Sequence, residues 1–394
     1  MNKLTIEDLD VKGKKVLLRV DLNVPLNENL VVTDNTRIQA AIPTIQYLLA
    51  KGAKLILISH LGRPKGKRSE NLSLRPVAEV LGKILNQHIV FCPDILGPVV
   101  QSAISCLKFG ECALLENIRF YPEEEKNDLR FSRELASIAD LYVNDAFGTA
   151  HRAHASTEGI AKYFDQAACG YLMNKELTYL GNLIKSPASP FCAIIGGAKV
   201  PDKIGVVMRL LDLVDDILIG GGMSYTFLKE KGHDIGDSIY NAENAHLVHQ
   251  AFEKAEKLGK TIHLPIDHLV AEKFSNDVPV KTVGVNIPNG HMGLDIGPKT
   301  IEQYLSVIQK AKTTFWNGPM GVFEMKNFQN GTFAIAQGMA ENQGVTVVGG
   351  GDSVAAMNQT GLGDKVSHIS TGGGASLEFL EGNSLPGVEV LTDK

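Results

Sequence analysis

The stretch that most constrains the fold is residues 193–203, AIIGGAKVPDK. A short apolar run, typical of a buried strand, ends at Gly196 and Gly197, and apolar residues then recur at helical spacing over residues 204–214. Pro201 suits the first position of such a helix, where a missing N–H costs nothing. The pattern predicts a strand, a glycine turn and a helix, which together point free backbone N–H groups at an anion.

Two lysines, Lys199 and Lys203, accompany this turn. We expect Lys203 in the first helical turn, where the helix dipole disfavours a cation and a bound polyanion would offset the cost. The alternative is an ordinary turn between strand and helix with solvated lysines. A Walker A loop is excluded, because G-x-x-x-x-G-K-[ST] does not occur in the chain. The ligand-binding interpretation is favoured because glycine clusters recur later in the sequence.

The first half of the chain alternates between apolar runs and helical patterns. Strands are predicted at residues 16–20, 55–59, 89–92, 113–115 and 141–143, with helices near 38–49, 74–85 and 98–107. Such alternation predicts an α/β fold with a parallel sheet and helices on both faces. Ligands of open parallel sheets bind at the carboxyl ends of the strands.

The loops after these strands bring polar and basic residues to one edge of the predicted sheet: Asp21, Asn23, Arg37, His60, Arg63, Arg119, His151 and Arg152. An Asx residue near a proline usually makes a turn, and a lone loop arginine is usually solvated. Several like charges on one edge repel one another unless an anion gathers them, and guanidinium forks suit phosphate and carboxylate oxygens. We therefore expect a small, multiply anionic ligand here.

Two details of this half are further expectations. The acidic run at residues 123–125 is expected to form a solvated loop. Arg37 is expected at a helix start with no acidic neighbour within one turn, where its charge is unfavourable unless an anion lies beside it.

In the second half, glycine clusters at residues 196–197, 220–222, 349–351 and 372–374 follow predicted strands, and residues 287–297 are expected as a glycine-rich loop. Glycine is needed where backbone approaches a ligand closely, so the clusters predict a floor poor in side chains that suits a nucleotide. Glycines that merely end their strands are the alternative. That alternative leaves unexplained the residues that accompany the clusters: Lys199, Lys203, Glu324 and Asp352.

Composition narrows the class of protein. A chain of 394 residues favours two or more domains, and its net charge of −5 gives no indication of nucleic-acid or membrane partners. The N-terminus has no apolar signal region, and no apolar stretch reaches transmembrane length. Five scattered cysteines without a C-x-x-C pair favour a reducing compartment, so a cytoplasmic location is expected.

Several long motifs resemble phosphoglycerate kinase. In the first half they are RVDLNVP, SHLGRP, LLENIRF and NDAFGTAHRAHAS, and in the second half GGAKVPDK, IGGGM, WNGPMGVFE, GGGDS and STGGGASLEFLEG. The resemblance covers essentially the whole chain. Ser353, where threonine is frequent, and Ile118, where leucine is frequent, are mild departures.

The resemblance implies two Rossmann-like domains joined by a long helix and a hinge. We expect residues 1–170 with 383–394 to bind phosphoglycerate, residues 171–186 to form the interdomain helix, and residues 187–382 to bind the nucleotide. It also implies a monomer of glycolysis that transfers a phosphoryl group reversibly from 1,3-bisphosphoglycerate to ADP, giving 3-phosphoglycerate and ATP, with Mg²⁺.

The resemblance also implies roles for individual residues. The substrate site would use Asp21, Asn23, Arg37, His60, Arg63, Arg119 and Arg152. The nucleotide site would use Gly197, Lys203, Gly222, Asn317, Glu324, Gly350, Gly351, Asp352 and Ser353, with Asp352 also the metal ligand. Arg37, Lys199 and Gly373 would surround the transferred group, which needs positioning and charge neutralisation rather than a general base.

Two other classes of protein remain as alternatives. A nucleotide-dependent dehydrogenase is disfavoured, because no G-x-G-x-x-G with a downstream acidic residue occurs and clustered arginines suit it poorly. A two-domain binding protein that closes around its ligand is usually exported, and this chain has no signal peptide. An assay of ATP formation from ADP and an acyl phosphate would discriminate among them.

Overall fold

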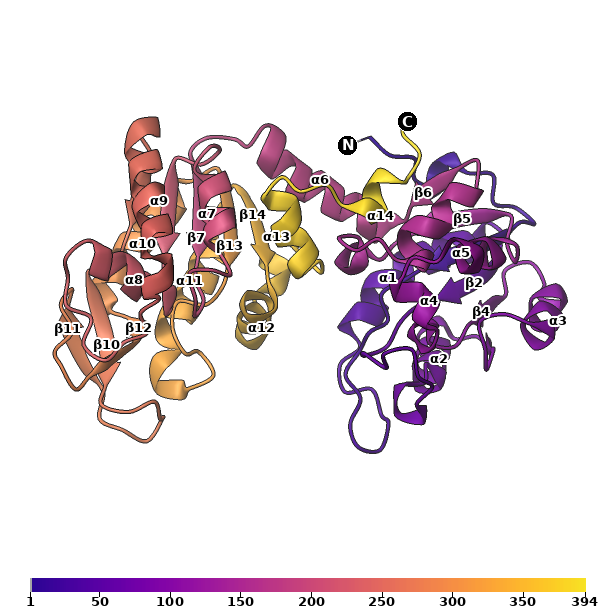
Figure 1. Ribbon diagram of the computed structural model, residues 1–394, viewed down its shortest axis with the longest axis horizontal. Coiled ribbons are helices and arrows are strands. Elements are labelled where there is room, and N and C mark those ends of the chain that lie inside the picture. Colours follow the sequence, from indigo (N-terminus) through magenta and orange to yellow (C-terminus); the bar gives the residue numbers. More distant parts are fainter. Residues whose placement is uncertain (1) are drawn as a thin grey trace. The chain divides into compact units, whose positions relative to one another are not determined.

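The computed structural model describes residues 2–394, which form two compact units. The N-terminal unit comprises the chain up to Thr178 together with Ser384–Lys394, and the C-terminal unit comprises Tyr179–Asn383. Each unit contains a six-stranded parallel sheet flanked by helices (Figure 1), so the predicted α/β class is confirmed.

The N-terminal sheet has the strand order β3-β4-β2-β1-β5-β6, and every neighbouring pair is parallel. Its strands are β1 (Lys15–Arg19), β2 (Lys54–Ile58), β3 (Ile89–Phe91), β4 (Cys112–Leu114), β5 (Leu141–Asn144) and β6 (Ala167–Cys169). Because the strands are parallel, all their carboxyl ends lie at one edge of the sheet.

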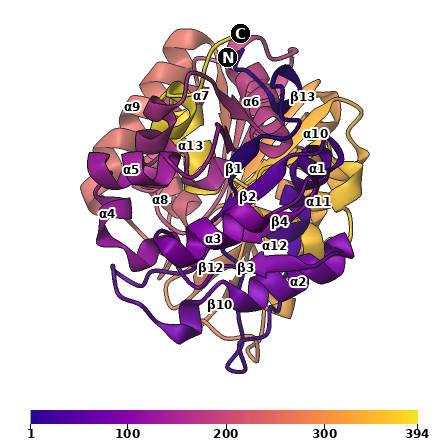
Figure 2. The same cartoon turned by 90° about the vertical axis from the view of Figure 1, so that its right-hand side faces the viewer.

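Helices cover both faces of this sheet. They are α1 (Thr36–Ala50), α2 (Arg75–Leu85), α3 (Pro98–Cys106), α4 (Pro122–Glu125), α5 (Leu129–Ala136) and α14 (Pro386–Glu389), while α6 (Tyr171–Lys185) runs from one unit into the other. Figure 2 shows α1 and α2 on one side of β1 and β2, and α4 and α5 on the other. Ile38 and Ile45 of α1 and Leu81 of α2 are fully buried in one cluster with Leu18 and Leu57 of the strands.

The two ends of the chain meet in the N-terminal unit. The Leu4 N–H donates to the Thr392 carbonyl at 2.8 Å, and Lys3 forms a 2.8 Å ion pair with Asp393. The Gly387 N–H donates to the carbonyl of Ala150 at 2.9 Å, and Ala150 lies in the segment that follows β5. Residues 384–394 therefore pack in the N-terminal unit, together with residues from the start of the chain.

The C-terminal unit contains two sheets. The parallel sheet has the order β15-β14-β13-β7-β8-β9, and a three-stranded antiparallel sheet has the order β11-β10-β12. The parallel strands are β7 (Phe191–Ile195), β8 (Asp216–Ile219), β9 (Thr261–His263), β13 (Thr313–Asn317), β14 (Val345–Gly349) and β15 (His368–Ile369). The antiparallel strands are β10 (Asp267–Ala271), β11 (Lys281–Gly284) and β12 (Met292–Ile296).

The expectation of a loop over residues 287–297 is wrong in its second half, where β12 forms. Leu294 and Ile296 alternate along this strand and are almost fully buried. Period-two alternation is a strand signal, but the glycines around it concealed that signal.

The helices of this unit are α7 (Ile204–Leu210), α8 (Met223–Glu230), α9 (Ala245–Leu258), α10 (Pro298–Lys310), α11 (Asn330–Glu341), α12 (Gly351–Thr360) and α13 (Gly374–Leu380). Trp316 of β13 lies in a buried cluster with Leu218 of β8, Tyr304 of α10 and Ile335 of α11. Helix α7 starts later than expected, so Pro201 lies in the turn before it rather than at its first position. Among the described residues no helix is long and apolar enough to cross a membrane.

Replacing Leu218 by alanine should lower the free energy of unfolding by about 2–5 kcal/mol, because the fully buried side chain leaves a cavity. Urea unfolding can be followed through the single tryptophan, Trp316, which lies in the same cluster. Leu258→Ala is the matched control, since Leu258 is 42% exposed, and it should change the value by less than about 1 kcal/mol. Equal effects of the two substitutions would contradict this assignment of the core.

Candidate functional site

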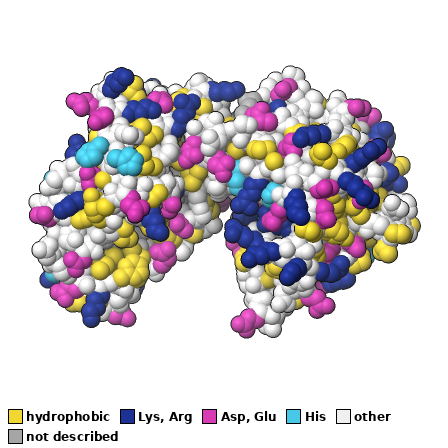
Figure 3. All heavy atoms as spheres, viewed as in Figure 1, with side chains coloured by type: hydrophobic (Ala, Val, Ile, Leu, Met, Phe, Trp, Pro, Cys, Tyr) yellow, Lys and Arg dark blue, Asp and Glu magenta, His cyan; other side chains and the backbone are white. Residues whose placement is uncertain are grey.

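The side chains predicted to bind an anion follow four adjacent strands of the N-terminal sheet. Asp21 and Asn23 come after β1, His60 and Arg63 after β2, Arg119 after β4, and His151 and Arg152 after β5. These strands are neighbours in the order β4-β2-β1-β5, so their loops meet at one edge. Figure 3 shows Lys, Arg and His side chains gathered on one face of this unit.

The backbone of Gly62 connects three of these loops. Its N–H donates to Oδ1 of Asn23 at 2.8 Å, and its carbonyl accepts from Nη1 of Arg119 at 2.9 Å. Arg119 is almost fully buried, and its Nε lies 3.6 Å from Oε1 of Glu125 without a hydrogen bond. Burial, followed by repulsion from Arg19, lowers the pKa of Arg119 to about 10. A buried guanidinium with spare donors is well suited to an anionic ligand.

Arg37 lies at the start of α1 as predicted, and its charge has an acidic partner from outside its own helical turn. Its Nη1 forms an ion pair with Oδ2 of Asp21, a residue sixteen positions earlier in the chain. The Asp21 side chain is only 9% exposed, whereas that of Arg37 is 41% exposed. The carboxylate therefore offsets the cost of a cation at a helix start, and Arg37 still presents much of its surface to solvent.

Arg19 is a buried member of this group that the sequence analysis did not assign. It is the last residue of β1, and Nη2 lies 3.2 Å from Nδ1 of His60. Its Nε donates to Oγ of Ser156 at 2.9 Å, and Nη1 donates to the carbonyl of Val20. An arginine in an otherwise apolar strand is the signal that could have identified it.

The expectation that the acidic run at residues 123–125 forms a solvated loop is wrong. Residues 122–125 form the short helix α4, and Glu124 is fully buried rather than solvated. Its carboxylate accepts the N–H of Ser156 at 2.8 Å and the hydroxyl of Ser156 at 2.6 Å. Nδ1 of His154 lies 3.8 Å from Oε1 of Glu124. We call Arg19, Arg37, His60, Arg63, Arg119, His151, Arg152 and His154 the basic cluster.

Two of the three imidazoles of the basic cluster, those of His60 and His154, have lowered pKa values. Burial, and then the charge of Arg19, holds the pKa of His60 well below its ordinary value. Burial, and then the charge of Arg119, lowers the pKa of His154 to about 4. Both imidazoles are therefore neutral at neutral pH and take part as hydrogen-bonding groups.

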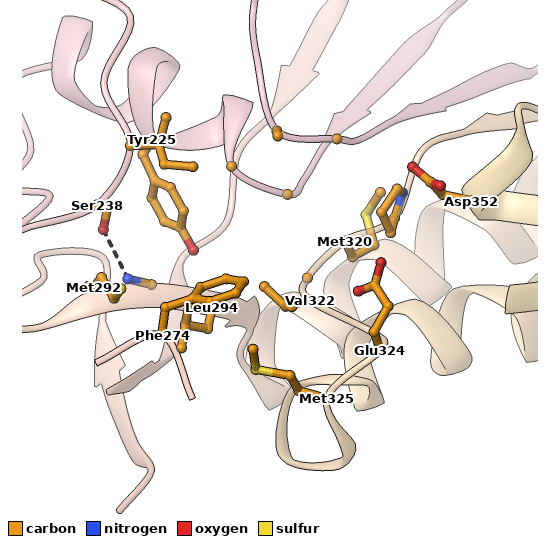
Figure 4. Close-up of a pocket in the computed structure, with 18 of the residues that line it drawn as sticks. Tyr225, Ser238, Phe274, Met292, Leu294, Met320, Val322, Glu324, Met325 and Asp352 are labelled. Atoms are coloured by element: carbon orange, nitrogen blue, oxygen red, sulfur yellow. Dashed lines mark hydrogen bonds between the residues drawn. The ribbon is translucent and has the colours of Figure 1, made fainter. Parts of the chain in front are cut away.

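A cavity of about 550 Å³ lies in the C-terminal unit (Figure 4). Its walls come from the loops after β7, β8 and β13, the start of α12, and the antiparallel sheet with its connecting segments. The predicted residues Gly197, Gly222, Glu324 and Asp352 line it. The volume is within the range of small-molecule and cofactor pockets.

Backbone contacts hold the glycine loops at the floor of this cavity. The Gly197 N–H donates to the Pro319 carbonyl at 3.1 Å, and the Gly221 N–H donates to the Met320 carbonyl at 2.9 Å. Gly197 has φ +120° and Gly221 φ +66°, conformations that favour glycine. A side chain on Gly221 would also run into the backbone of Gly197, so the loops approach as closely as glycine allows.

One wall of the cavity is apolar and was not predicted from the sequence. Opposite Glu324 and Asp352, Figure 4 shows Tyr225, Phe274, Met292 and Leu294 facing the space. Phe274 is 62% exposed, so this wall is open to solvent at one end. Such a wall suits a flat apolar group such as a nucleotide base. Alternation in residues 292–296 was the signal that could have revealed part of it.

Lys203 and Lys199 differ in their surroundings. Lys203 caps the start of α7, its Nζ contacts Oδ1 of Asn317, and burial lowers its pKa while Asp352 and Asp202 oppose that shift. Lys199 is exposed, two residues after the pocket glycine Gly197. The expectation that Lys203 lies within the first helical turn is therefore off by one position.

Several predicted nucleotide residues lie behind the cavity rather than in its wall. Asn317 and Ser353 are fully buried, and the Ser353 hydroxyl accepts the Gly318 N–H at 2.5 Å. Gly350 is the N-terminal cap of α12, and Gly351 is its first residue, next to Asp352. Gly373 caps the seven-residue helix α13 and does not line the cavity.

The fold and these sites match known proteins. The family model described as phosphoglycerate kinase matches residues 6–383. The chain is 55% identical to the phosphoglycerate kinase of Clostridium botulinum strain Langeland over 396 residues, covering 100% of this chain and 99% of the relative. It is 54% identical to that of Clostridium novyi over 397 residues, covering 100% of both.

Solved structures of phosphoglycerate kinases are also similar to this chain. The phosphoglycerate kinase from Coxiella burnetii has a TM-score of 0.90 at 38% identity, and the one from Pyrococcus horikoshii has a TM-score of 0.85 at 35% identity. Each comparison covers 98% of this chain and 98% of the other. With its two parallel-sheet units, its basic cluster and its glycine-floored cavity, the chain belongs to the phosphoglycerate kinase family.

Proposed function

We propose that this chain catalyses the reversible transfer of a phosphoryl group from 1,3-bisphosphoglycerate to ADP, giving 3-phosphoglycerate and ATP. The observation that carries the proposal is the pairing of two unlike sites in one chain of this family. A guanidinium-rich edge lies in one unit, and a glycine-floored cavity with an apolar wall lies in the other. The first suits a multiply anionic small molecule and the second a nucleotide.

The basic cluster would bind the phosphoglycerate. Arg63, Arg119 and Arg152 would hold the phosphate that does not move, with His60 as a neutral hydrogen-bond donor. Asp21 and Asn23 would meet the hydroxyl and carboxylate end. This division is supported by the buried, incompletely paired guanidinium of Arg119 and by the carboxylate of Asp21, which can accept from a hydroxyl.

The cavity would bind ADP or ATP. The base would lie against the apolar wall, with Glu324 accepting from the ribose hydroxyls and Gly197 and Gly222 letting the nucleotide approach the backbone. Lys203 would pair with the phosphates. Asn317 holds the Lys203 amine, and Ser353 holds the Gly318 N–H, so both support the site from behind. Gly350 and Gly351 shape the start of α12.

The residues beside the cavity fit a magnesium–nucleotide complex. Among residues 2–394 no group of three or more His, Cys, Asp or Glu side chains could hold a metal, but Mg²⁺ bound to phosphates needs only one or two protein carboxylates. Asp352 lines the cavity, is exposed, and would be that ligand. When bound, Mg²⁺ would neutralise charge on the phosphate oxygens.

Transfer would need no general base, because the attacking phosphate oxygen of ADP is already ionised. Arg37 and Lys199 would stabilise charge on the transferred group, with backbone N–H groups at Gly373. The two ligands would bind to different units, and hinge closure about α6 stays a prediction. A monomeric state and a cytoplasmic location also stay predictions.

The direct test is the purified chain assayed in both directions. ATP formation from ADP and 1,3-bisphosphoglycerate, and consumption of ATP with 3-phosphoglycerate, should both be observed. Activity that required a nicotinamide cofactor, or the absence of transfer in either direction, would contradict the proposal.

Asp352→Asn should raise the Mg²⁺ concentration for half-maximal activity about tenfold, because the substitution keeps the shape but removes a charged ligand. The measurement is initial rate against Mg²⁺ at fixed nucleotide. Glu324→Gln, which changes another carboxylate that lines the cavity, should raise the KM for nucleotide and leave the Mg²⁺ dependence unchanged. An unchanged Mg²⁺ dependence in Asp352→Asn would remove Asp352 from the metal role.

Arg119→Ala should raise the KM for 3-phosphoglycerate about tenfold or more, since one charge-assisted hydrogen bond contributes about 1.5–3 kcal/mol. Arg63→Ala should act in the same direction. Arg130→Ala is the control, because Arg130 lies on α5 with a side chain that is 89% exposed, and it should change no kinetic constant. A rise in the nucleotide KM instead would mean that the ligands are assigned to the wrong units.

Arg37→Ala should lower kcat by about 10³-fold and leave both KM values near normal, because charge stabilisation of the moving group is strongest in the transition state. Arg37→Lys should recover only part of the rate, since it keeps the charge and loses the planar fork. Steady-state kinetics of both variants in both directions provide the measurement. If Arg37→Ala kept kcat within a few-fold of wild type, the main role of Arg37 would be its ion pair with Asp21.

A further inference from the structure

We propose that Glu124 and Ser156 are positioning residues that act through Arg19 to fix which nitrogen of His60 carries its proton, and so set the affinity for 3-phosphoglycerate. The inference rests on the proposed function for its ligand. The geometry that carries it is a continuous chain of hydrogen bonds from a fully buried carboxylate to a histidine of the binding site.

The first link joins Glu124 to Ser156. Both carboxylate oxygens of Glu124 are engaged, one by the Ser156 N–H at 2.8 Å and one by the Ser156 hydroxyl at 2.6 Å. The hydroxyl has one proton to donate, and this bond uses it. Its remaining lone pairs are therefore available to accept from a donor on the other side.

The second link joins Ser156 to Arg19. Nε of Arg19 donates to the Ser156 hydroxyl at 2.9 Å, and both residues are fully buried. Arginine is always protonated and has donors only, so the direction of this bond is fixed. With Nη1 on the Val20 carbonyl, two of the three guanidinium nitrogens are held, and the plane of the group is set.

The third link joins Arg19 to His60. Nη2 of Arg19 lies 3.2 Å from Nδ1 of His60, and because arginine can only donate, Nδ1 must accept. A neutral imidazole that accepts at Nδ1 carries its proton at Nε2. His60 therefore presents an N–H at its far nitrogen, which suits an anionic oxygen of the substrate.

The surroundings of Glu124 explain why a carboxylate is placed here. Burial raises its pKa, while Arg19, Ser156 and Arg119 act in the opposite direction. It is the buried counter-charge among several guanidinium groups, and Nδ1 of His154 also lies 3.8 Å from it. A purely structural role would predict lost stability without a selective loss of 3-phosphoglycerate affinity.

The test is Ser156→Ala, which removes the central hydroxyl and leaves Glu124, Arg19 and His60 in place. We expect the KM for 3-phosphoglycerate to rise about tenfold and the KM for ATP to stay within about twofold. In ¹⁵N-histidine NMR spectra, wild type should show His60 in the Nε2–H form, and the variant should show a mixture of both tautomers. His60→Gln identifies the His60 signals.

Ser132→Ala is the matched control, because Ser132 is also a fully buried serine of this unit and its hydroxyl donates only to the Asp128 carbonyl. It should change neither KM nor the spectrum. If Ser156→Ala does not fold, Arg19→Lys replaces it, since lysine keeps the charge but lacks the fork that reaches Ser156 and His60 together.

The inference is overturned if the KM for 3-phosphoglycerate in Ser156→Ala matches that of Ser132→Ala, or if it rises while the His60 tautomer is unchanged. Failure of the proposed function gives a different result, namely wild-type protein that does not phosphorylate 3-phosphoglycerate. In that case the spectra alone still test the chain of hydrogen bonds.

Discussion

Parallel pairing of strands is the constraint on which both sites depend. A parallel sheet places the carboxyl ends of all its strands at one edge, so loops distant in sequence are neighbours in space. In the N-terminal unit this brings the loops after β1, β2, β4 and β5 together, and Gly62 is the backbone junction among three of them. In the C-terminal unit the same rule assembles a cavity from glycine loops. The two units share an architecture and differ in what their loops carry.

The two units carry different polar groups in the loops of their parallel sheets. The N-terminal unit concentrates guanidinium groups and holds them on oxygen acceptors: the Ser156 hydroxyl for Arg19, the Gly62 carbonyl for Arg119 and the Asp21 carboxylate for Arg37. The C-terminal unit has a cavity floored by glycine backbone, with Lys203 held on Asn317 and with three acidic side chains, Asp237, Glu324 and Asp352, in the cavity lining. Buried polar groups need partners, and in both units the partners come from the ends of neighbouring strands or from the segments that follow them.

Much of the fold could be predicted from sequence because apolar runs and glycine turns are local signals, and the α/β class and most strands were found this way. The errors lie where a partner is distant. Glu124 meets Ser156 32 residues later, and Arg37 meets Asp21 sixteen residues earlier, so no local pattern shows either pairing. Residues 292–296 were missed because glycines concealed a short alternating strand. Most predicted site residues came from the ends of predicted strands and from the glycine clusters, and their individual roles came from the family resemblance. Ser156 and most of the apolar wall emerged only from packing.

The meeting of the chain ends has a consequence for how the protein is made. Residues 384–394 belong to the N-terminal unit, yet the ribosome adds them only after the whole of the C-terminal unit. Until then Leu4 lacks its Thr392 acceptor and Ala150, next to the loop of His151 and Arg152, lacks the Gly387 contact. The unit synthesised first is thus the one completed last, and a nascent chain that lacks residues 384–394 contains a complete C-terminal unit and an incomplete N-terminal unit.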